Sequence, residues 1–377
     1  MSATSFGSMT PNEREEFLSQ PALAAPDGFT SNLTNPESRN DLGLSVTTAC
    51  TVIAGILFLL RLYAFFVYRK ETRIQEGLAL VAAATYIILL YPGYHLVKIG
   101  AFYVHQWDMD RHKFSEVLLM SYLMTTMWYL TMLFAKSAIM LEWLRVFWPG
   151  HSRNSIYWIC NITLGVLVAY FTAGFIFFQA RCQPFDKAWH PWLEGNCANR
   201  SYIDKASVFF NIALDLVIFV LPQIMVWKLH ASLKRRIGKS IIFSFALLSI
   251  GCGSGRAQNV FTFRYSADVA YSLSSGYLWA LGECTIVVLV YCALPISRIY
   301  TEPKVPPVLV PLNRWYRSRF GGSQPPASET ASKNTKAKYW VPSKPSSLSP
   351  APNNNVYERM DDSTHSEVHL TDLPPLR

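Results

Sequence analysis

The feature that most constrains this chain is a series of long apolar runs, each with the length of a membrane-spanning helix. About 20 mostly apolar residues are needed to cross the roughly 30 Å of hydrocarbon in a bilayer. Seven runs meet this requirement, at residues 44–68, 77–98, 117–142, 155–179, 206–228, 240–263 and 274–298. The sequence therefore predicts an all-α, polytopic membrane protein built as a seven-transmembrane helix bundle.

Composition and charge agree with a membrane protein and argue against a nucleic-acid partner. Only 16% of the 377 residues are charged, against about a quarter in an ordinary soluble domain. The formal net charge is +9, but the basic residues lie in short segments between apolar runs rather than in one stripe. Their distribution predicts cytosolic loops at 68–73, 145–153 and 228–239. The N-terminus is then outside or lumenal, and the C-terminus is cytosolic.

The two ends of the chain differ from the bundle at 44–299. Residues 1–43 are polar and have no basic segment followed by an apolar one, so we expect the first span to insert as its own signal anchor. Residues 300–377 are rich in Pro, Ser, Asn and Lys, which predicts a disordered tail. Asn32 and Asn199 begin glycosylation sequons on the predicted outer side, which makes both predicted glycan sites. A third sequon, at Asn161, falls inside a predicted span and is discounted.

The segment "RCQPFDKAWHPWLEGNC" (181–197) is predicted to form a lid between the fourth and fifth spans. Cys182 and Cys197 are the cysteines that lie clearly outside the spans, and they face an oxidising compartment, so we expect a disulfide between them. The enclosed tryptophans could cover the mouth of the bundle; the alternative is a stapled loop without a ligand. No Cys/His cluster has zinc spacing, and no metal or cofactor is expected.

Charged side chains at one level of the bundle are the candidate catalytic residues. At 1.5 Å per residue, Asp215, Arg256 and Glu283 fall about 10–15 Å below the outer boundary. One guanidinium can balance one carboxylate, so the second acid is expected to remain protonated. Asp215 and Glu283 are therefore candidate proton donors. Arg256 and Asn211, the latter one helical turn before Asp215, are candidate orienting groups. The alternative is an ion-pair cluster with a structural or switching role.

Two further patterns lie in the third and sixth runs. Lys136, Glu142 and Arg145 in "FAKSAIMLEWLRVF" are predicted to form an inner ionic latch near the cytosolic interface, separate from the carboxylate level. Lys136 would need a partner on another helix, because residues six apart do not share a helical face. The sequence "GCGSG" (251–255) predicts close helix packing or a helix break rather than a phosphate-binding loop.

Several pieces in order along residues 21–300 resemble the fungal rhodopsin-like integral membrane proteins. They are "PALAAPDGFTSNLTNP", "AKSAIMLEWLRVF", "CQPFDKAWHPWLEGNC", "ALDLVIFVLPQIMVWKL", Arg256 and "ALPISRIY". This family includes surface-sensing receptor-like proteins and membrane proteins of mycotoxin and other secondary-metabolite clusters. The chain lacks the cysteine-rich extracellular domain of many receptor-like members and has Glu76 where they often carry paired aspartates. Glu142 within "LEWLRVF" resembles the secondary-metabolite subgroup, to which membrane-bound cyclases of farnesyl-derived chains are similar.

Two functions follow as expectations. The first is a membrane-bound terpene cyclase, in which a dry carboxylic acid protonates a farnesyl-derived, meroterpenoid-type chain and aromatic rings stabilise the carbocation. The alternative is a G-protein-coupled-receptor-like surface sensor with a pocket under the lid, a hinge at 251–255 and a G protein at the basic loop 228–239. It would not carry retinal, because the seventh run has no lysine. Either protein would bind a lipophilic small molecule within the bilayer of the endoplasmic reticulum or plasma membrane; a carrier is less favoured because the chain has no evident inverted repeat.

Overall fold

The computed structural model describes residues 6–68, 74–147, 155–198, 201–228, 233–262 and 268–301. Within these residues the chain is almost entirely helical. Its elements, in chain order, are α1 (Pro11–Ser19), α2 (Asn40–Tyr68), α3 (Ile74–Lys98), η2 (Gln106–Asp108), α4 (Arg111–Phe147), α5 (Ser155–Gln179), β1 (Cys182–Gln183), η3 (Phe185–Ala188), β2 (Asn196–Cys197), α6 (Ser201–Lys228), α7 (Leu233–Thr262) and α8 (Val269–Thr301).

The seven ranges predicted as spans fall on the seven long helices α2 to α8. Several helices extend beyond their apolar runs, most of all α4, which has 37 residues. Over the described residues, α2, α3, α4, α5 and α8 are long and apolar enough to cross a membrane. The structure thus supports an all-α, polytopic membrane protein.

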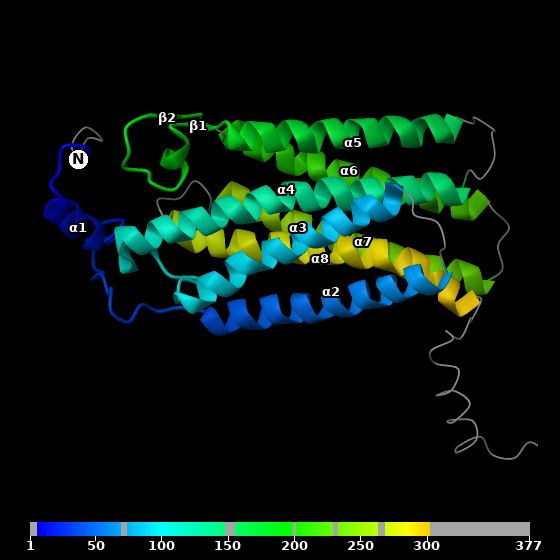
Figure 1. The fold of residues 1–377 in the computed structure, drawn as a ribbon, viewed down its shortest axis with the longest axis horizontal. Coiled ribbons are helices and arrows are strands. Elements are labelled where there is room, and N and C mark those ends of the chain that lie inside the picture. Colours follow the sequence, from blue (N-terminus) through cyan, green and yellow to red (C-terminus); the bar gives the residue numbers. More distant parts are fainter. Residues whose placement is uncertain are drawn as a thin grey trace, which may run out of the picture. The chain divides into compact units, whose positions relative to one another are not determined.

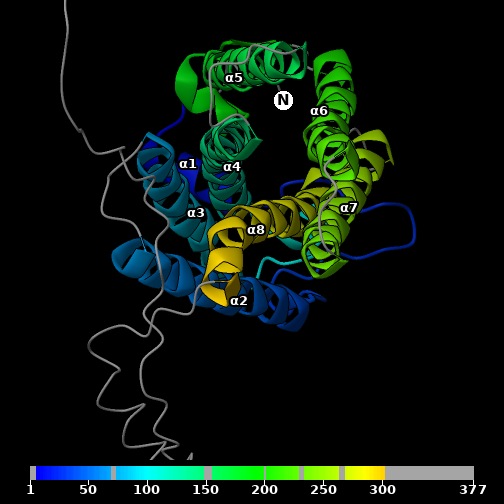
Figure 2. The same cartoon turned by 90° about the vertical axis from the view of Figure 1, so that its right-hand side faces the viewer.

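Helices α4 and α8 occupy the middle of the bundle. Helix α4 contacts α3, α5, α6 and α8, and α8 contacts α2, α3, α4 and α7; Figure 2 shows these two helices surrounded by the others. Large side chains are buried inside the bundle, including Tyr86, Phe171 and Tyr277, each no more than 2% exposed. Residues on the inner faces of α4 and α8 are therefore enclosed by protein on nearly every side.

One end of the bundle carries an ordered cap made by the N-terminal segment and the lid (Figure 1). Helix α1 begins with a capping box, in which the backbone and hydroxyl of Thr10 both donate to Glu13. The segment after α1 is tied to the start of α4, because Ala22 N donates to Met109 O at 2.9 Å and Arg111 N donates to Gln20 O at 3.1 Å. Part of the predicted N-terminal tail is therefore folded onto the bundle.

Helix α7 continues without a break through the glycine-rich stretch 251–255. A Cβ atom on Gly255 would lie 2.5 Å from the ring of Trp279 on α8, and one on Gly253 would lie 3.3 Å from Ile212 on α6. The glycines thus allow α7 to approach two neighbouring helices closely. Of the two roles predicted for this stretch, the structure has close helix packing and not a break.

Candidate functional site

A buried ion pair joins α4 to α6. The ammonium Nζ of Lys136 lies 2.6 Å from Oδ1 of Asp215, and each side chain is only 2% exposed. Lys136 also donates a hydrogen bond of 3.0 Å to Oδ1 of Asn211, one turn earlier on α6. Its ammonium lies 5.3 Å from the ring centre of Phe171 on α5. Three helices therefore enclose this one positive charge.

A second ion pair joins α7 to α8 and is linked to the first through Asn211. Glu283 is fully buried; its Oε1 accepts a 2.7 Å hydrogen bond from Nδ2 of Asn211. Its other oxygen, Oε2, lies 3.4 Å from Nη1 of Arg256 and accepts a hydrogen bond from the indole of Trp128 at 3.3 Å. The guanidinium of Arg256 lies 3.9 Å from the ring centre of Trp128. We call these six residues the charge network: Trp128, Lys136, Asn211, Asp215, Arg256 and Glu283.

The charges of this network balance. Two cations face two carboxylates, and a buried charge is tolerated only when it is paired and hydrogen-bonded. From the sequence, one acid was expected to lack a counter-ion, because Lys136 was placed at a different level. In the structure that acid is paired, and of the four carboxylate oxygens in the network, Oδ2 of Asp215 is the one without a hydrogen-bond partner among the described residues.

A cleft adjoins the charge network on the side of the lid. It is lined by residues of five helices: Ser121, Met124, Thr125, Trp128, Tyr129, Phe178, Asp204, Ser207, Val208, Arg256, Asn259, Val260, Ser272, Leu273, Gly276 and Ala280. Its volume is about 70 Å³, enough for a few water molecules and well below the roughly 300–1,000 Å³ of pockets for drug-sized ligands. Arg256 and Trp128 belong to both the cleft and the network, whereas Asp215 and Glu283 do not line the cleft.

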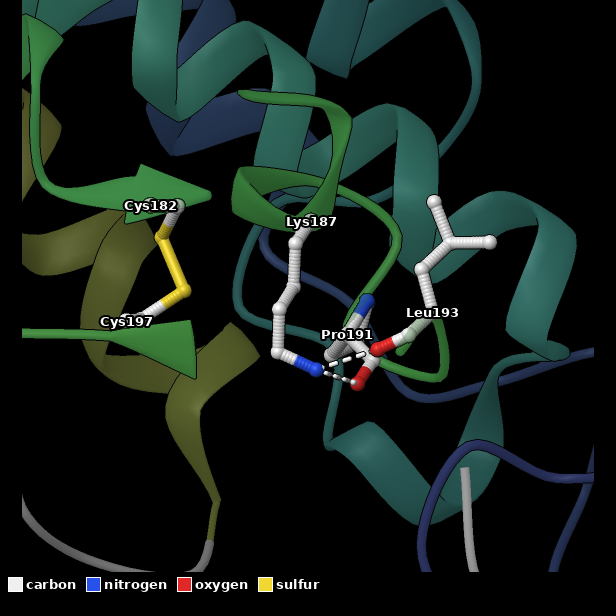
Figure 3. The surroundings of a disulfide bond; sticks show 5 residues. All are labelled: Cys182, Lys187, Pro191, Leu193 and Cys197. Carbon is white, nitrogen blue, oxygen red and sulfur yellow. Dashed lines mark hydrogen bonds between the residues drawn. A yellow bond between two sulfur atoms is a disulfide. The ribbon is translucent and has the colours of Figure 1, made fainter. Parts of the chain in front are cut away.

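The lid has the predicted disulfide. Cys182 and Cys197 are bonded and face each other across the two-stranded pairing of β1 with β2. Within the loop, the ammonium of Lys187 donates to the backbone oxygens of Pro191 and Leu193, as Figure 3 shows. The lid is also tied to α4, because Ser115 Oγ lies 2.9 Å from both the carbonyl oxygen of Trp189 and Nδ1 of His190. The segment is thus an ordered cap with internal and external contacts.

The family model of the fungal rhodopsin domain matches residues 60–302, which cover α3 to α8 and part of α2. The chain belongs to the fungal rhodopsin family. All six residues of the charge network fall within the matched range, and so does the lid. The resemblance found in the sequence is thereby confirmed, and the protein is a multi-pass membrane protein.

Two of three relatives of this fungal rhodopsin protein are named as proteins of biosynthesis clusters. It is 32% identical over 296 residues to a "Fugralins biosynthesis cluster protein 2" of Gibberella zeae, a match that covers 76% of this chain and 72% of the relative. It is 27% identical over 309 residues to the "Polyenoic acids biosynthesis gene cluster protein Ba17b" of Metarhizium anisopliae, covering 76% and 79%. A "SAT4 family membrane protein" of Emericella nidulans is 31% identical over 117 residues, covering 31% and 30%.

The structure brings together the predicted carboxylate-level residues but divides the predicted latch. Lys136 lies with Asp215 on α6, as its need for a partner on another helix indicated, and not with Glu142. Glu142 and Arg145 stay close to each other on α4, with 3.9 Å between Oε2 and Nη1. Lys136 was misplaced because the length of α4 was judged from its apolar run, whereas the helix extends well beyond both ends of that run.

A third buried ion pair of the fungal rhodopsin bundle was not predicted from the sequence. Arg61 of α2 and Glu76 of α3 are 3.0 Å apart, and Arg61 also donates to the backbone oxygen of Tyr291 at 3.0 Å. The guanidinium lies 3.6 Å from the ring centre of Tyr291. Opposite charges near the ends of two consecutive apolar runs were the available signal. This pair ties α2, α3 and α8 together.

The remaining predicted sites add little to the chemistry. Asn32 is exposed, and its amide donates to Asn35 O at 2.9 Å; glycosylation there remains a prediction. Asn199 lies outside the described residues, as do residues 302–377 of the predicted tail. Among the described residues no group of three or more His, Cys, Asp or Glu side chains could hold a metal ion.

Proposed function

We propose that this membrane protein of the fungal rhodopsin family is a ligand-responsive sensor in secondary metabolism, a seven-helix bundle that works without retinal. A lipophilic small molecule would bind in the cleft, and the charge network would change its pairing in response. Two relatives support a role in secondary metabolism, since both are named as proteins of biosynthesis clusters.

One observation carries the proposal: Arg256 both lines the cleft and pairs with Glu283. The distance of 3.4 Å between Nη1 and Oε2 exceeds the usual 2.7–3.2 Å of an N–H···O bond. The guanidinium Nε is buried and has no hydrogen-bond partner among the described residues. A polar ligand group in the cleft could therefore bond Arg256 and weaken its hold on Glu283.

The response would pass from α7 to the other helices of the network. Glu283 on α8 is connected through Asn211 on α6 to Lys136 on α4, so a change at one ion pair alters the electrostatics of the other. Helix α7 packs closely on α6 at Gly253 and on α8 at Gly255. A shift of α7 would therefore be transmitted to both neighbours, and packed helix interfaces of this kind can convert local binding into a larger rearrangement.

A terpene cyclase acting on a farnesyl-derived chain is the second candidate. It is supported by the rings of Trp128, Tyr129 and Phe178 in the cleft, which could stabilise a carbocation. It requires Asp215 or Glu283 to protonate a substrate, although each carboxylate has a cationic partner and neither lines the cleft. It also requires the cleft to open severalfold beyond about 70 Å³. We therefore place it behind the sensor.

The sensor proposal includes topology and a partner. Seven crossings, an outer or lumenal N-terminus and a cytosolic C-terminus would place the lid outside and the segment 228–239 in the cytosol. That basic segment would contact a G protein; its residues 229–232 lie outside the described residues. The compartment would be the endoplasmic reticulum or the plasma membrane.

The test uses the full-length protein in nanodiscs with two probes, a farnesylated phenol and an eighteen-carbon polyenoic acid. Thermal unfolding with and without probe reports binding, and chromatography with mass spectrometry of the same samples reports conversion. A sensor raises the unfolding temperature and returns the probe unchanged. A product of unchanged mass but shifted retention, lost in Asp215→Asn or Glu283→Gln, would establish the cyclase instead.

Two variants locate the binding site and its response. Arg256→Gln should abolish the rise in unfolding temperature, while Arg39→Gln, an exposed arginine outside the cleft, should leave it unchanged. Hydrogen exchange of α7 should change on probe binding in the wild type. If Arg256→Gln responds to the probe as the wild type does, the cleft is not the ligand site and the sensor proposal fails.

A further inference from the structure

A second and larger pocket lies under the lid, outside the residues of the charge network. Its volume is about 300 Å³, within the range of pockets for small organic ligands. It shares no lining residue with the cleft: its walls are Phe6, Leu18, His112, Ser115, Glu116, Leu119, Trp189, His190, Trp192 and Leu193. A pocket under the lid was part of the receptor alternative, but its composition was not foreseen.

Three segments far apart in the chain build this lid pocket. The N-terminal segment contributes Phe6, whose ring centre lies 6.0 Å from that of Trp192. Phe17 of α1 contacts the same indole at 6.2 Å. On the opposite side, Ser115 of α4 bonds Trp189 and His190 of the lid. The pocket is therefore complete only when the N-terminal segment, the lid and α4 are all in place.

The electrostatics of the lid pocket favour a cation. Among the described residues that line the pocket, Glu116 is the one carboxylate; it is 39% exposed, and its Oε1 lies 3.9 Å from Nε2 of His95. Burial is the main reason that the pKa of His190 is lowered, so its imidazole is neutral at pH 7. Aromatic rings with their negative faces make up much of the remaining wall.

The nearby cations are engaged elsewhere and do not line the pocket. Arg14 donates to the carbonyl of Gly7 at 3.2 Å, and Lys113 donates to that of Gly100 at 3.2 Å. Arg111 donates to Phe17 O at 2.8 Å and lies 3.9 Å from the ring centre of Phe17. Lys113 is close enough to Glu116 to interact with it electrostatically, but none of these three cations forms part of the pocket wall.

We propose that the lid pocket binds a lipophilic ammonium compound, with the cation beside Glu116 and the apolar part against Trp189, Trp192 and Phe6. Aromatic walls with one carboxylate are the arrangement that recognises alkylated ammonium groups, because desolvated cations interact with ring faces. This site is independent of the ligand cleft at Arg256, and either proposal can fail without the other.

The experiment measures equilibrium binding of radiolabelled benzyltrimethylammonium to the full-length protein in nanodiscs of zwitterionic lipid. Neopentylbenzene, its uncharged isostere, serves as competitor. We expect saturable binding of one cation per chain and at least about tenfold weaker competition by the neutral compound. Glu116→Gln and Trp192→Leu should each weaken binding about tenfold, and Trp192→Phe, which keeps a ring, should weaken it less.

Matched controls use residues away from the pocket. Glu15→Gln removes an exposed carboxylate on α1, and Trp158→Leu removes an exposed indole on α5; both should bind as the wild type does. Thermal unfolding of every variant identifies any that fail to fold, and Trp192→Phe keeps the test decisive if Trp192→Leu is among them. Absence of saturable binding, equal competition by neopentylbenzene, or wild-type binding by Glu116→Gln overturns the proposal.

Discussion

Lys136 of α4 and Asp215 of α6 form an ion pair of 2.6 Å in which both side chains are almost completely buried. In such a pair the loss of one partner costs more than the loss of both, because the remaining charge has neither water nor a counter-ion. We expect Lys136→Met to destabilise the protein by about 3–5 kcal/mol. The double variant Lys136→Met/Asp215→Leu should recover most of that loss. Denaturant unfolding in mixed micelles measures both, and a double variant as unstable as the single one would contradict the expectation.

Helix α7 offers a matched pair of glycines. Gly255→Ala would place a Cβ about 2.5 Å from the ring of Trp279, whereas a Cβ on Gly251 has nothing within 4 Å. We expect Gly255→Ala to lower the unfolding temperature and Gly251→Ala to leave it unchanged or raise it, since alanine stabilises a helix by up to about 1 kcal/mol over glycine. Equal effects of the two substitutions would mean that the contact between α7 and α8 is looser than the structure has it.

His190 should make the lid sensitive to acid. Burial lowers its pKa below the ordinary value of 6.5, an effect that nearby Asp186 opposes and His112 reinforces. A lowered pKa means that the folded lid favours neutral histidine. The stability it contributes is therefore complete above about pH 6.5 and declines as the pH falls through the lowered pKa. Hydrogen exchange of residues 182–197 should increase over this interval, and His190→Asn should flatten the profile.

The disulfide should stabilise the lid and the pocket beneath it. Cys182 and Cys197 are 15 residues apart, and closing a loop of that length is worth about 3 kcal/mol in the chain-entropy model. The variant Cys182→Ser/Cys197→Ser should lose benzyltrimethylammonium binding before it loses the helix bundle, as followed by circular dichroism. Cys160→Ser, which removes a buried cysteine that forms no disulfide, is the control.

Glycan mapping tests the predicted orientation. If the N-terminus and the lid side face the lumen, Asn32→Gln and Asn199→Gln should each increase electrophoretic mobility by one glycan, and Asn161→Gln should change nothing. Treatment with an endoglycosidase identifies the mass as glycan. A mobility change with Asn161→Gln alone would contradict both the predicted spans and the orientation.

The positions of the long helices could be predicted from the sequence because each must present an apolar run of bilayer length. The common level of Asp215, Arg256 and Glu283 could also be predicted, whereas the level of Lys136 could not. Which residue pairs with Lys136 depends on how far α4 extends beyond its apolar run and on how α4 and α6 are offset along their axes. The sequence of one apolar run contains neither piece of information. The Arg61–Glu76 pair was missed for the same reason, since it joins two different helices.

In the lid, the covalent link could be predicted from the sequence, but the contacts with the N-terminal segment could not. Its disulfide was predicted from compartment and position, and the structure has that bond. The docking of the N-terminal segment on Trp192 was not predicted, although Thr10 and Glu13 in "TPNEREE" are spaced as a capping box and indicate a short helix. A nine-residue helix of polar composition gives no sign of the surface it covers.

The length of α4 means that one continuous helix contributes residues to the lid pocket, the cleft and the charge network. Ser115 and Glu116 lie at its lid end, Trp128 beside the cleft, Lys136 in the core and Glu142 towards its other end. A shift of α4 along its axis by the rise of one residue, about 1.5 Å, would displace the residues at all four places together. The cap and the opposite end of the bundle are thus mechanically coupled through α4. A ligand under the lid could therefore shift the buried ion pairs without contacting them.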